Sequence, residues 1–173
     1  MAEFMQFVSD LLTVSQSLQC QTLALGHEPD CQPLLQQMVV RKYESVVSTA
    51  TDLLAEVSDS ASIWYLRGDA LAHLGRYGEA IDSFTQTLRY CPHAKLALAF
   101  QAVCWIHLTD YERALACCDR ALDIDSAHAQ AWIFRGVALH RLGRYREAYR
   151  CYDRATANDA RPWWQRLPGQ SNR

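Results

Sequence analysis

The sequence Leu-Gly-Arg-Tyr-Gly-Glu-Ala over residues 74–80 returns almost unchanged as Leu-Gly-Arg-Tyr-Arg-Glu-Ala over residues 142–148. The two copies lie 68 residues apart, and a weaker copy lies midway between them, at residues 108–114. A period of 34 residues without gaps therefore divides the chain into three units, 61–94, 95–128 and 129–162. Such a period indicates a repeat architecture, in which neighbouring units stack to bury a shared core.

The three units carry the same residue types at matching positions. These positions are Trp64, Leu98 and Trp132; Gly68, Ala102 and Gly136; Leu74, Leu108 and Leu142; Tyr77, Tyr111 and Tyr145; and Ala80, Ala114 and Ala148. Apolar residues recur at three- and four-residue spacing over two stretches of each unit, 61–74 and 77–90 in the first, which predicts two amphipathic helices. We expect the small residues at positions 68 and 80 to let these two helices approach closely.

This pattern resembles the tetratricopeptide repeat, which has a 34-residue period and a W…L-G-x-x-Y…A signature. The resemblance covers residues 61–162. It implies an all-α fold, a right-handed superhelical stack of antiparallel helix pairs (TPR-type α-solenoid). It also implies that the chain binds other proteins and is not an enzyme, with no catalytic residues.

Outside the three repeats the pattern weakens. Residues 27–60 keep Tyr43 at the aromatic position, but Pro33 falls inside the first helix, so we expect a degenerate, shortened helix pair beginning near Pro33. Residues 1–26 are expected to form an amphipathic helix, over 3–25, and a turn. Residues 163–173 are expected to be a short tail whose Trp163 and Trp164 cover the end of the stack.

Composition limits the function classes. Half of the 173 residues are hydrophobic and 21% are charged, which excludes a wholly disordered chain. The start of the sequence lacks the features of a secretory signal, and no stretch approaches the roughly 20 apolar residues of a membrane span. The seven cysteines, an odd number, fit a reduced, cytoplasmic protein better than a disulfide scaffold.

The formal net charge of −2 excludes a uniformly basic nucleic-acid binder, but it hides a strong asymmetry. Residues 1–60 hold 2 basic and 8 acidic side chains, whereas residues 129–173 hold 9 basic and 3 acidic ones. This distribution predicts either head-to-tail self-association or an acidic partner near the C-terminal end.

In the family that the repeats resemble, the first helix of each pair lines the concave face. Carried over position by position, this implies a partner-binding groove that would take an amphipathic helix or an apolar peptide. The residues of this predicted groove are Tyr65, Leu66, Asp69, His73, Leu96, Phe100, Val103, His107, Ile133, Phe134, Val137 and Arg141. An exposed apolar lining usually marks an interaction site, although the helix expected over residues 3–25 could fill the groove instead.

Some family members clamp the terminal carboxylate of heat-shock chaperones with Lys, Asn and Arg side chains. The matching positions in this sequence are Tyr65, Asp69, Phe100, Gln130 and Phe134, so we do not expect that clamp here. Adaptor, scaffold or complex-assembly roles all fit the resemblance, with peripheral association with a membrane complex as one variant.

The alternative is a regulatory sensor that responds to pH, metal or redox state through groove histidines or cysteines. No motif for a phosphate, dinucleotide or zinc ligand occurs, so we expect no metal and no cofactor.

A second candidate surface lies near the end of the third repeat. Arg146, Arg150 and Arg154 recur every four residues and share a helix face, with Arg144 at its start. The four arginines are either a solvated exterior or an electrostatic docking patch for an acidic partner, a membrane surface or RNA. The sequence offers no interleaved aromatic residues for base stacking, so RNA is the weakest of these partners.

Overall fold

The computed structural model describes residues 31–156. The helix expected over residues 3–25, the end of the third repeat and the tail at 163–173 lie outside the described residues. Within 31–156 the secondary structure consists of eight α-helices and no strand. No helix in this part of the chain is long and apolar enough to cross a membrane.

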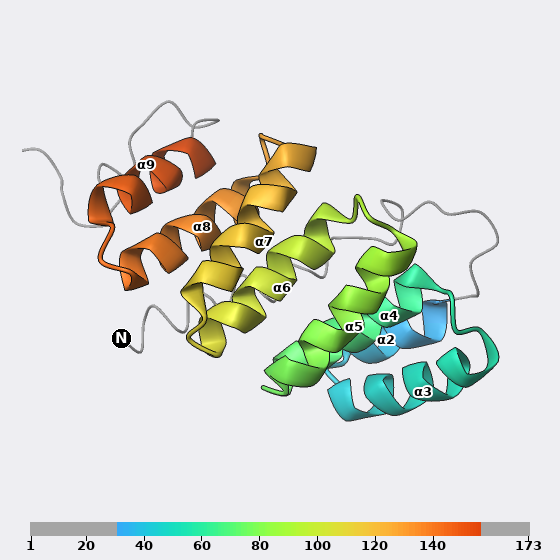
Figure 1. Cartoon of the computed structure of the whole chain (residues 1–173). Helices are drawn as coiled ribbons and strands as arrows, with labels where there is room; N and C mark the ends of the chain where they lie inside the picture. The colour runs from blue at the N-terminus through green and yellow to red at the C-terminus, as the bar shows by residue number, and fades with distance from the viewer. Residues whose placement is uncertain (1–30, 157–173) are drawn as a thin grey trace, which may run out of the picture. The chain divides into compact units, whose positions relative to one another are not determined.

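The chain divides into two compact units, with the boundary between Pro92 and His93. Unit 1 contains α2 (Gln32–Val39), α3 (Tyr43–Glu56), α4 (Ala61–His73) and α5 (Tyr77–Tyr90). Unit 2 contains α6 (Lys95–His107), α7 (Tyr111–Ile124), α8 (Ala129–Arg141) and α9 (Tyr145–Ala155), drawn from yellow-green to red in Figure 1. In unit 1, α4 packs against α3 and α5; in unit 2, α7 packs against α6 and α8, and α8 against α9.

The helix boundaries follow the sequence period. First helices begin at Ala61, Lys95 and Ala129, and second helices begin at the three repeat tyrosines, so each start advances by the 34-residue period. The segment before the repeats holds α2, which begins at Gln32 with Pro33 in its first turn, where proline is tolerated.

The turn between the two helices of a pair is the same in each repeat. In the first, the amide of Gly75 donates to Ala72 and that of Arg76 to Leu71, the two hydrogen bonds of a Schellman motif. Gly75 and Gly143 take the left-handed conformation that this motif requires, both with φ of 76°. The middle repeat places Thr109 there, with φ of 63°.

The two helices of each pair meet at residues of complementary size. A Cβ atom added to Gly68 would lie 2.8 Å from the Phe84 ring, and one added to Gly136 would meet the Tyr152 ring even more closely. In the middle repeat the same two positions hold Ala102 and Cys118. Alanine is larger than the glycine of the other repeats, and the cysteine that faces it is smaller than their aromatic rings. The close approach predicted from the small residues is therefore confirmed.

The seventh position of the first and third units holds an arginine, Arg67 and Arg135, that hydrogen-bonds to both neighbouring helices. Arg67 Nη1 donates to Ser83 Oγ at 2.7 Å and Nε donates to Thr51 Oγ1 at 3.3 Å. Each arginine thus joins the second helices before and after its own helix, a partnership that a sequence spacing of sixteen residues does not reveal by itself.

Candidate functional site

The predicted groove residues lie on α4 in unit 1 and on α6 and α8 in unit 2. Most of them are buried, which differs from the expectation of a solvent-facing lining. The buried ones are Tyr65, Leu66, Asp69, Phe100, Val103, Phe134 and Val137; His73, Leu96, His107 and Ile133 are half-buried, and Arg141 is exposed. Because the two units are separate bodies, each holds its own part of this set.

Helix α6 shows how complete the burial is. Every residue from Ala97 to Cys104 is buried, and eight consecutive residues cover more than two helical turns and hence all faces of the helix. A helix that is apolar and buried all round belongs to a core. Among the predicted groove residues of unit 2, Leu96, His107 and Ile133 are half-buried and Arg141 is exposed, whereas Phe100 and Phe134 are buried.

In unit 1 the groove positions hold a polar cluster. Asp69 is 3% exposed, and its Oδ1 lies 3.6 Å from His73 Nε2 one helical turn later. The His73 ring stacks on Tyr43 of α3, with centroids 4.5 Å apart and planes 5° apart. Burial raises the pKa of Tyr43, so its hydroxyl stays protonated at neutral pH. The cluster joins α3 to α4 and has the character of a structural network.

Burial keeps one groove histidine and two thiols in their neutral forms. Burial lowers the pKa of His107, which keeps its ring neutral at physiological pH. Burial also raises the pKa of Cys117 to about 11, and raises the pKa of Cys118 further, so both thiols stay protonated and unreactive. Among residues 31–156, no three His, Cys, Asp or Glu side chains converge as metal ligands.

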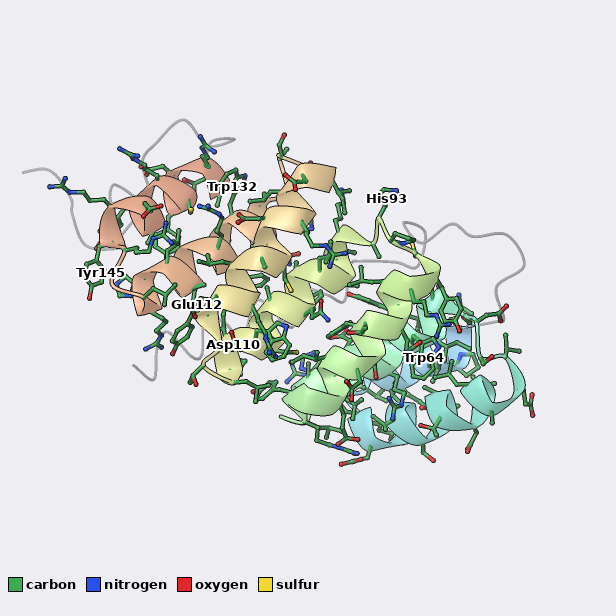
Figure 2. The ribbon with its side chains drawn as sticks, in the orientation of Figure 1. Trp64, His93, Asp110, Glu112, Trp132 and Tyr145 are labelled. Carbon is green, nitrogen blue, oxygen red and sulfur yellow. The ribbon has the colours of Figure 1, made fainter. Side chains whose placement is uncertain are left out.

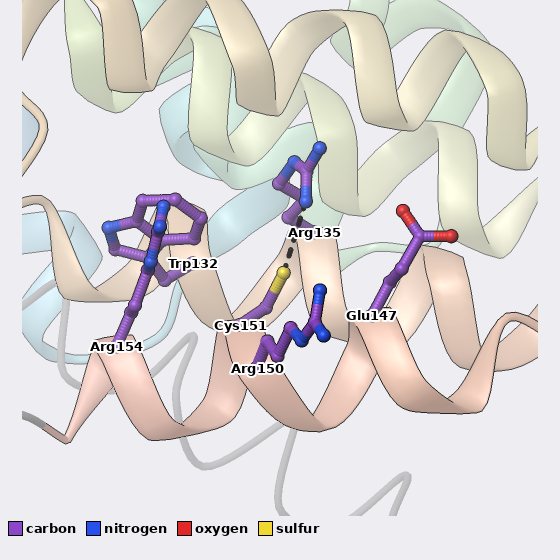
Figure 3. Close-up of a pocket in the computed structure, with 6 residues that line it drawn as sticks. All are labelled: Trp132, Arg135, Glu147, Arg150, Cys151 and Arg154. Carbon is purple, nitrogen blue, oxygen red and sulfur yellow. Dashed lines mark hydrogen bonds between the residues drawn. The ribbon is translucent and has the colours of Figure 1, made fainter.

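The arginine patch predicted on α9 separates into three environments. Arg144 is held by Glu147 through two hydrogen bonds of 2.7 Å. Arg146 is exposed and lies outside the cavity walls. Arg150 and Arg154 line a cavity of about 160 Å³ between α8 and α9. This cavity, which we call the Trp132 pocket, is lined by Trp132, Arg135, Glu147, Arg150, Cys151 and Arg154 (Figure 3).

Two members of the pocket are held rigidly. The indole Nε1 of Trp132 donates to the Ser126 carbonyl at 2.8 Å, and Trp64 in unit 1 makes the same bond to Ser58 (both tryptophans are labelled in Figure 2). Arg135 donates through Nε to Asp119 Oδ1 at 2.7 Å and through Nη1 to Cys151 Sγ at 3.2 Å. Trp132 and Arg135 are therefore held in the pocket by hydrogen bonds that also occur in the first repeat.

The open side of the pocket is positively charged. The Arg154 guanidinium lies over the Trp132 ring, 4.7 Å from its centroid, which is a cation–π distance. Arg150 and Arg154 are exposed, and within the described part of the chain neither forms an ion pair. The sequence had indicated the two arginines, but not Trp132 or Arg135; the signal that could have found them is the Trp–Arg spacing shared by positions 64 and 67 with 132 and 135.

Comparison with known proteins agrees with the repeat architecture. Two family models described as tetratricopeptide repeat match residues 61–94 and 106–167, which together are more than half of the chain. The human zinc finger CCCH domain-containing protein 7B is 28% identical over 104 residues. That match covers 53% of this chain and 11% of the relative, so the chain corresponds to about a tenth of that protein's length.

Two solved structures show the similarity of fold. The crystal structure of MamA has a TM-score of 0.68 at 15% identity, over 72% of each chain. The second TPR domain of Spaghetti (RPAP3), bound to the HSP90 peptide SRMEEVD, has a TM-score of 0.55 at 25% identity. That comparison covers 60% of this chain and 96% of the other.

Proposed function

The chain belongs to the tetratricopeptide repeat family, and we propose that it is a non-catalytic protein-interaction module that serves as an adaptor, a scaffold or a complex-assembly factor. The single observation that carries this proposal is the regular set of packed helix pairs, shared with structures that include one bound to a partner peptide. Stacked helix pairs present extended surfaces, which is how repeat proteins bind.

The partner surface that we propose is the first-helix face of unit 2, which we define by Leu96, Phe100, Ile133 and Phe134. Leu96 and Ile133 are half-buried and supply accessible apolar contact, while Phe100 and Phe134 on the same helices are buried, with 1% and 2% exposure. Such a surface suits one face of an amphipathic helix, whose apolar residues recur every three to four positions.

The peptide named for the RPAP3 domain is a less suitable partner for this chain. It carries acidic residues near its end, whereas Phe100 and Phe134 of this face are buried side chains that offer a carboxylate no hydrogen-bond donor. In unit 1, considered by itself, the buried Asp69 would repel a carboxylate. We therefore propose an apolar rather than a carboxylate-terminated partner for the first-helix face.

Affinity capture from native cells, followed by reconstitution with the purified partner, tests the proposal. The negative control is Ala114→Glu, which places a charge at a fully buried position of α7 and should unfold unit 2. We expect capture by the full chain and none by this variant. Deletion of residues 1–25 forms a second arm: tighter binding would identify that segment as a competitor for the face. Equal capture by the folded and the unfolded chain would contradict the proposal.

A further inference from the structure

We propose that the Trp132 pocket is a second binding site, separate from the first-helix face, that takes an acidic side chain of a partner peptide between Arg150 and Arg154. The inference rests on the proposed function in one respect, which is that the binding partner is a protein. Its structural basis is confined to α7, α8 and α9 in unit 2.

An internal comparison separates the structural part of the pocket from its charged part. Two periods earlier, Trp64, Arg67 and Ser83 stand where Trp132, Arg135 and Cys151 stand, and they make the same indole and guanidinium bonds. The shared set is therefore required by the packing of a helix pair and does not by itself indicate a ligand.

The two arginines have no counterpart in that first repeat. Asp82 and Gln86 occupy the positions equivalent to Arg150 and Arg154, although the scaffold around them is the same. The helix pair of the first repeat thus packs with Asp82 and Gln86 at these positions. The packing of the third repeat therefore does not require Arg150 and Arg154. Two cations about one helical turn apart, neither of which forms an ion pair within the described residues, favour an anionic ligand.

The charges around the pocket leave this attraction largely uncancelled. Glu147, the carboxylate that lines the pocket, pairs with Arg144, and Asp119, which lines an adjoining cavity, pairs with Arg135. Asp123 lines only the adjoining cavity of about 430 Å³, which shares Trp132, Arg135 and Arg154 with the pocket. An anion is therefore expected at the α9 end, away from Asp123.

Size and shape favour a side chain of a protein over a whole small molecule or a nucleic-acid base. The pocket volume of about 160 Å³ is well below the roughly 300 Å³ at which small-molecule sites begin. A base would have to stack on Trp132, but Arg154 already covers that ring and the indole N–H is bonded to Ser126. A planar guanidinium presents paired donors that match a carboxylate.

The test uses the full chain and a fluorescently labelled hexaglutamate peptide, acetylated and amidated so that it has no free terminus. Fluorescence anisotropy gives its dissociation constant for the wild type and for Arg150→Asp with Arg154→Gln, which installs the residues of the first repeat. We expect at least tenfold weaker binding by this variant, with an unchanged circular dichroism spectrum.

The matched control is Arg120→Asp with Arg146→Gln, which changes the net charge by the same amount as the test variant. It removes two exposed arginines that lie outside the pocket, one of them at the position of the middle repeat equivalent to Arg154, where Leu98 replaces the tryptophan. We expect less than a twofold change in this control. Equal losses in the two variants would show attraction to net charge only and would overturn the proposal.

Further probes separate other anions from the proposed ligand. A single-stranded RNA oligonucleotide, or phosphatidylserine vesicles, bound through Arg150 and Arg154 more tightly than hexaglutamate would overturn the assignment to a peptide. Failure of the wild type to bind hexaglutamate, with capture of a partner on the first-helix face retained, would overturn this site and leave the proposed function standing. Loss of all partner capture by the folded wild type would instead contradict the proposed function.

Discussion

Arg135 on α8 donates a hydrogen bond to the sulfur of Cys151 on α9 across 3.2 Å, and a hydrogen bond joins the equivalent two positions in every repeat, with its direction reversed in the middle one. In the first repeat Arg67 donates to Ser83 at 2.7 Å, and in the middle repeat Cys117 donates to Gln101 at 3.5 Å. The polar residue at position seven therefore joins the two helices of its own pair in all three units.

The hydrogen bonds of Arg135, which we call the Arg135 bridge, predict that removing this arginine lowers the stability of the protein more than removing an exposed one does. Arg135→Ala leaves Asp119 and Cys151 without their donor, so we expect the free energy of unfolding to fall by about 1–3 kcal/mol. Arg120→Ala, at an exposed position of the same unit, should change it by less than about 0.5 kcal/mol. Urea denaturation followed by circular dichroism measures both values. Similar small losses would show that the bridge contributes little.

The complementary sizes at the helix crossing predict a coupled pair. Gly136→Ala should cost about 1–3 kcal/mol, because its methyl group would meet the Tyr152 ring. Adding Tyr152→Cys recreates the Ala102–Cys118 pair of the middle repeat and should recover part of that loss. A double-mutant cycle on the free energy of unfolding measures the coupling. Strictly additive effects would mean that the close approach is not what restricts position 136.

Thr109 is a strained position that can be relieved. Its φ of 63° lies in the left-handed region, which costs a side chain with a Cβ atom roughly 1–2 kcal/mol. Thr109→Gly restores the residue of the other two repeats and should stabilise the chain by about 1 kcal/mol, since the flexibility of glycine offsets part of the gain. Gly143→Thr is the converse variant and should destabilise it. Thermal unfolding of both variants gives the comparison.

The helix cap that His128 forms should make the protein less stable in mild acid. Its Nδ1 accepts a hydrogen bond from the Ala131 amide at 3.3 Å and caps α8, which requires an unprotonated Nδ1. Burial, and then the charge of Lys95, lower the pKa of this ring in the folded state. A lowered pKa means that the contribution is complete above the unfolded value of about 6.5 and is lost as the pH falls below it.

The first repeat supplies the control for this titration. Ser60 caps α4 in the equivalent position, accepting from the Ile63 amide at 3.3 Å, and does not titrate. His128→Ser should therefore keep the cap and reduce the difference in the free energy of unfolding between pH 7.5 and pH 5. The remaining acid sensitivity includes His107, whose pKa is also lowered by burial. An unchanged difference would place the sensitivity elsewhere.

The sequence predicts the helices well because their ends depend on local chemistry that repeats. Tyr77 and Tyr145 begin second helices, and Gly75 and Gly143 form the turns before them, as the recurring Leu-Gly-Arg-Tyr strings indicate. Thr109 shows the limit, because nothing in its own residue type indicates a left-handed conformation; only its alignment with the two glycines does.

The site is less predictable because burial and pairing depend on neighbours that are distant in sequence. Apolar residues at Phe100 and Phe134 fit both an exposed groove and a packed helix, and only the structure shows that they are buried. Likewise, the sequence places Arg144 and Arg150 in one candidate patch, but one is held by Glu147 and the other lines a pocket.

The affinity of the captured, purified partner for the full chain tests the proposed interaction surface most directly. Leu96→Glu with Ile133→Glu changes the two half-buried residues of the first-helix face, and should weaken binding at least tenfold while the helical circular dichroism signal is retained. Leu108→Glu with Ile124→Glu places the same charges at apolar residues that are 44% and 37% exposed elsewhere in unit 2, and should leave the affinity within twofold. Unchanged affinity in the first variant, or equal losses in both, would contradict partner binding on that face.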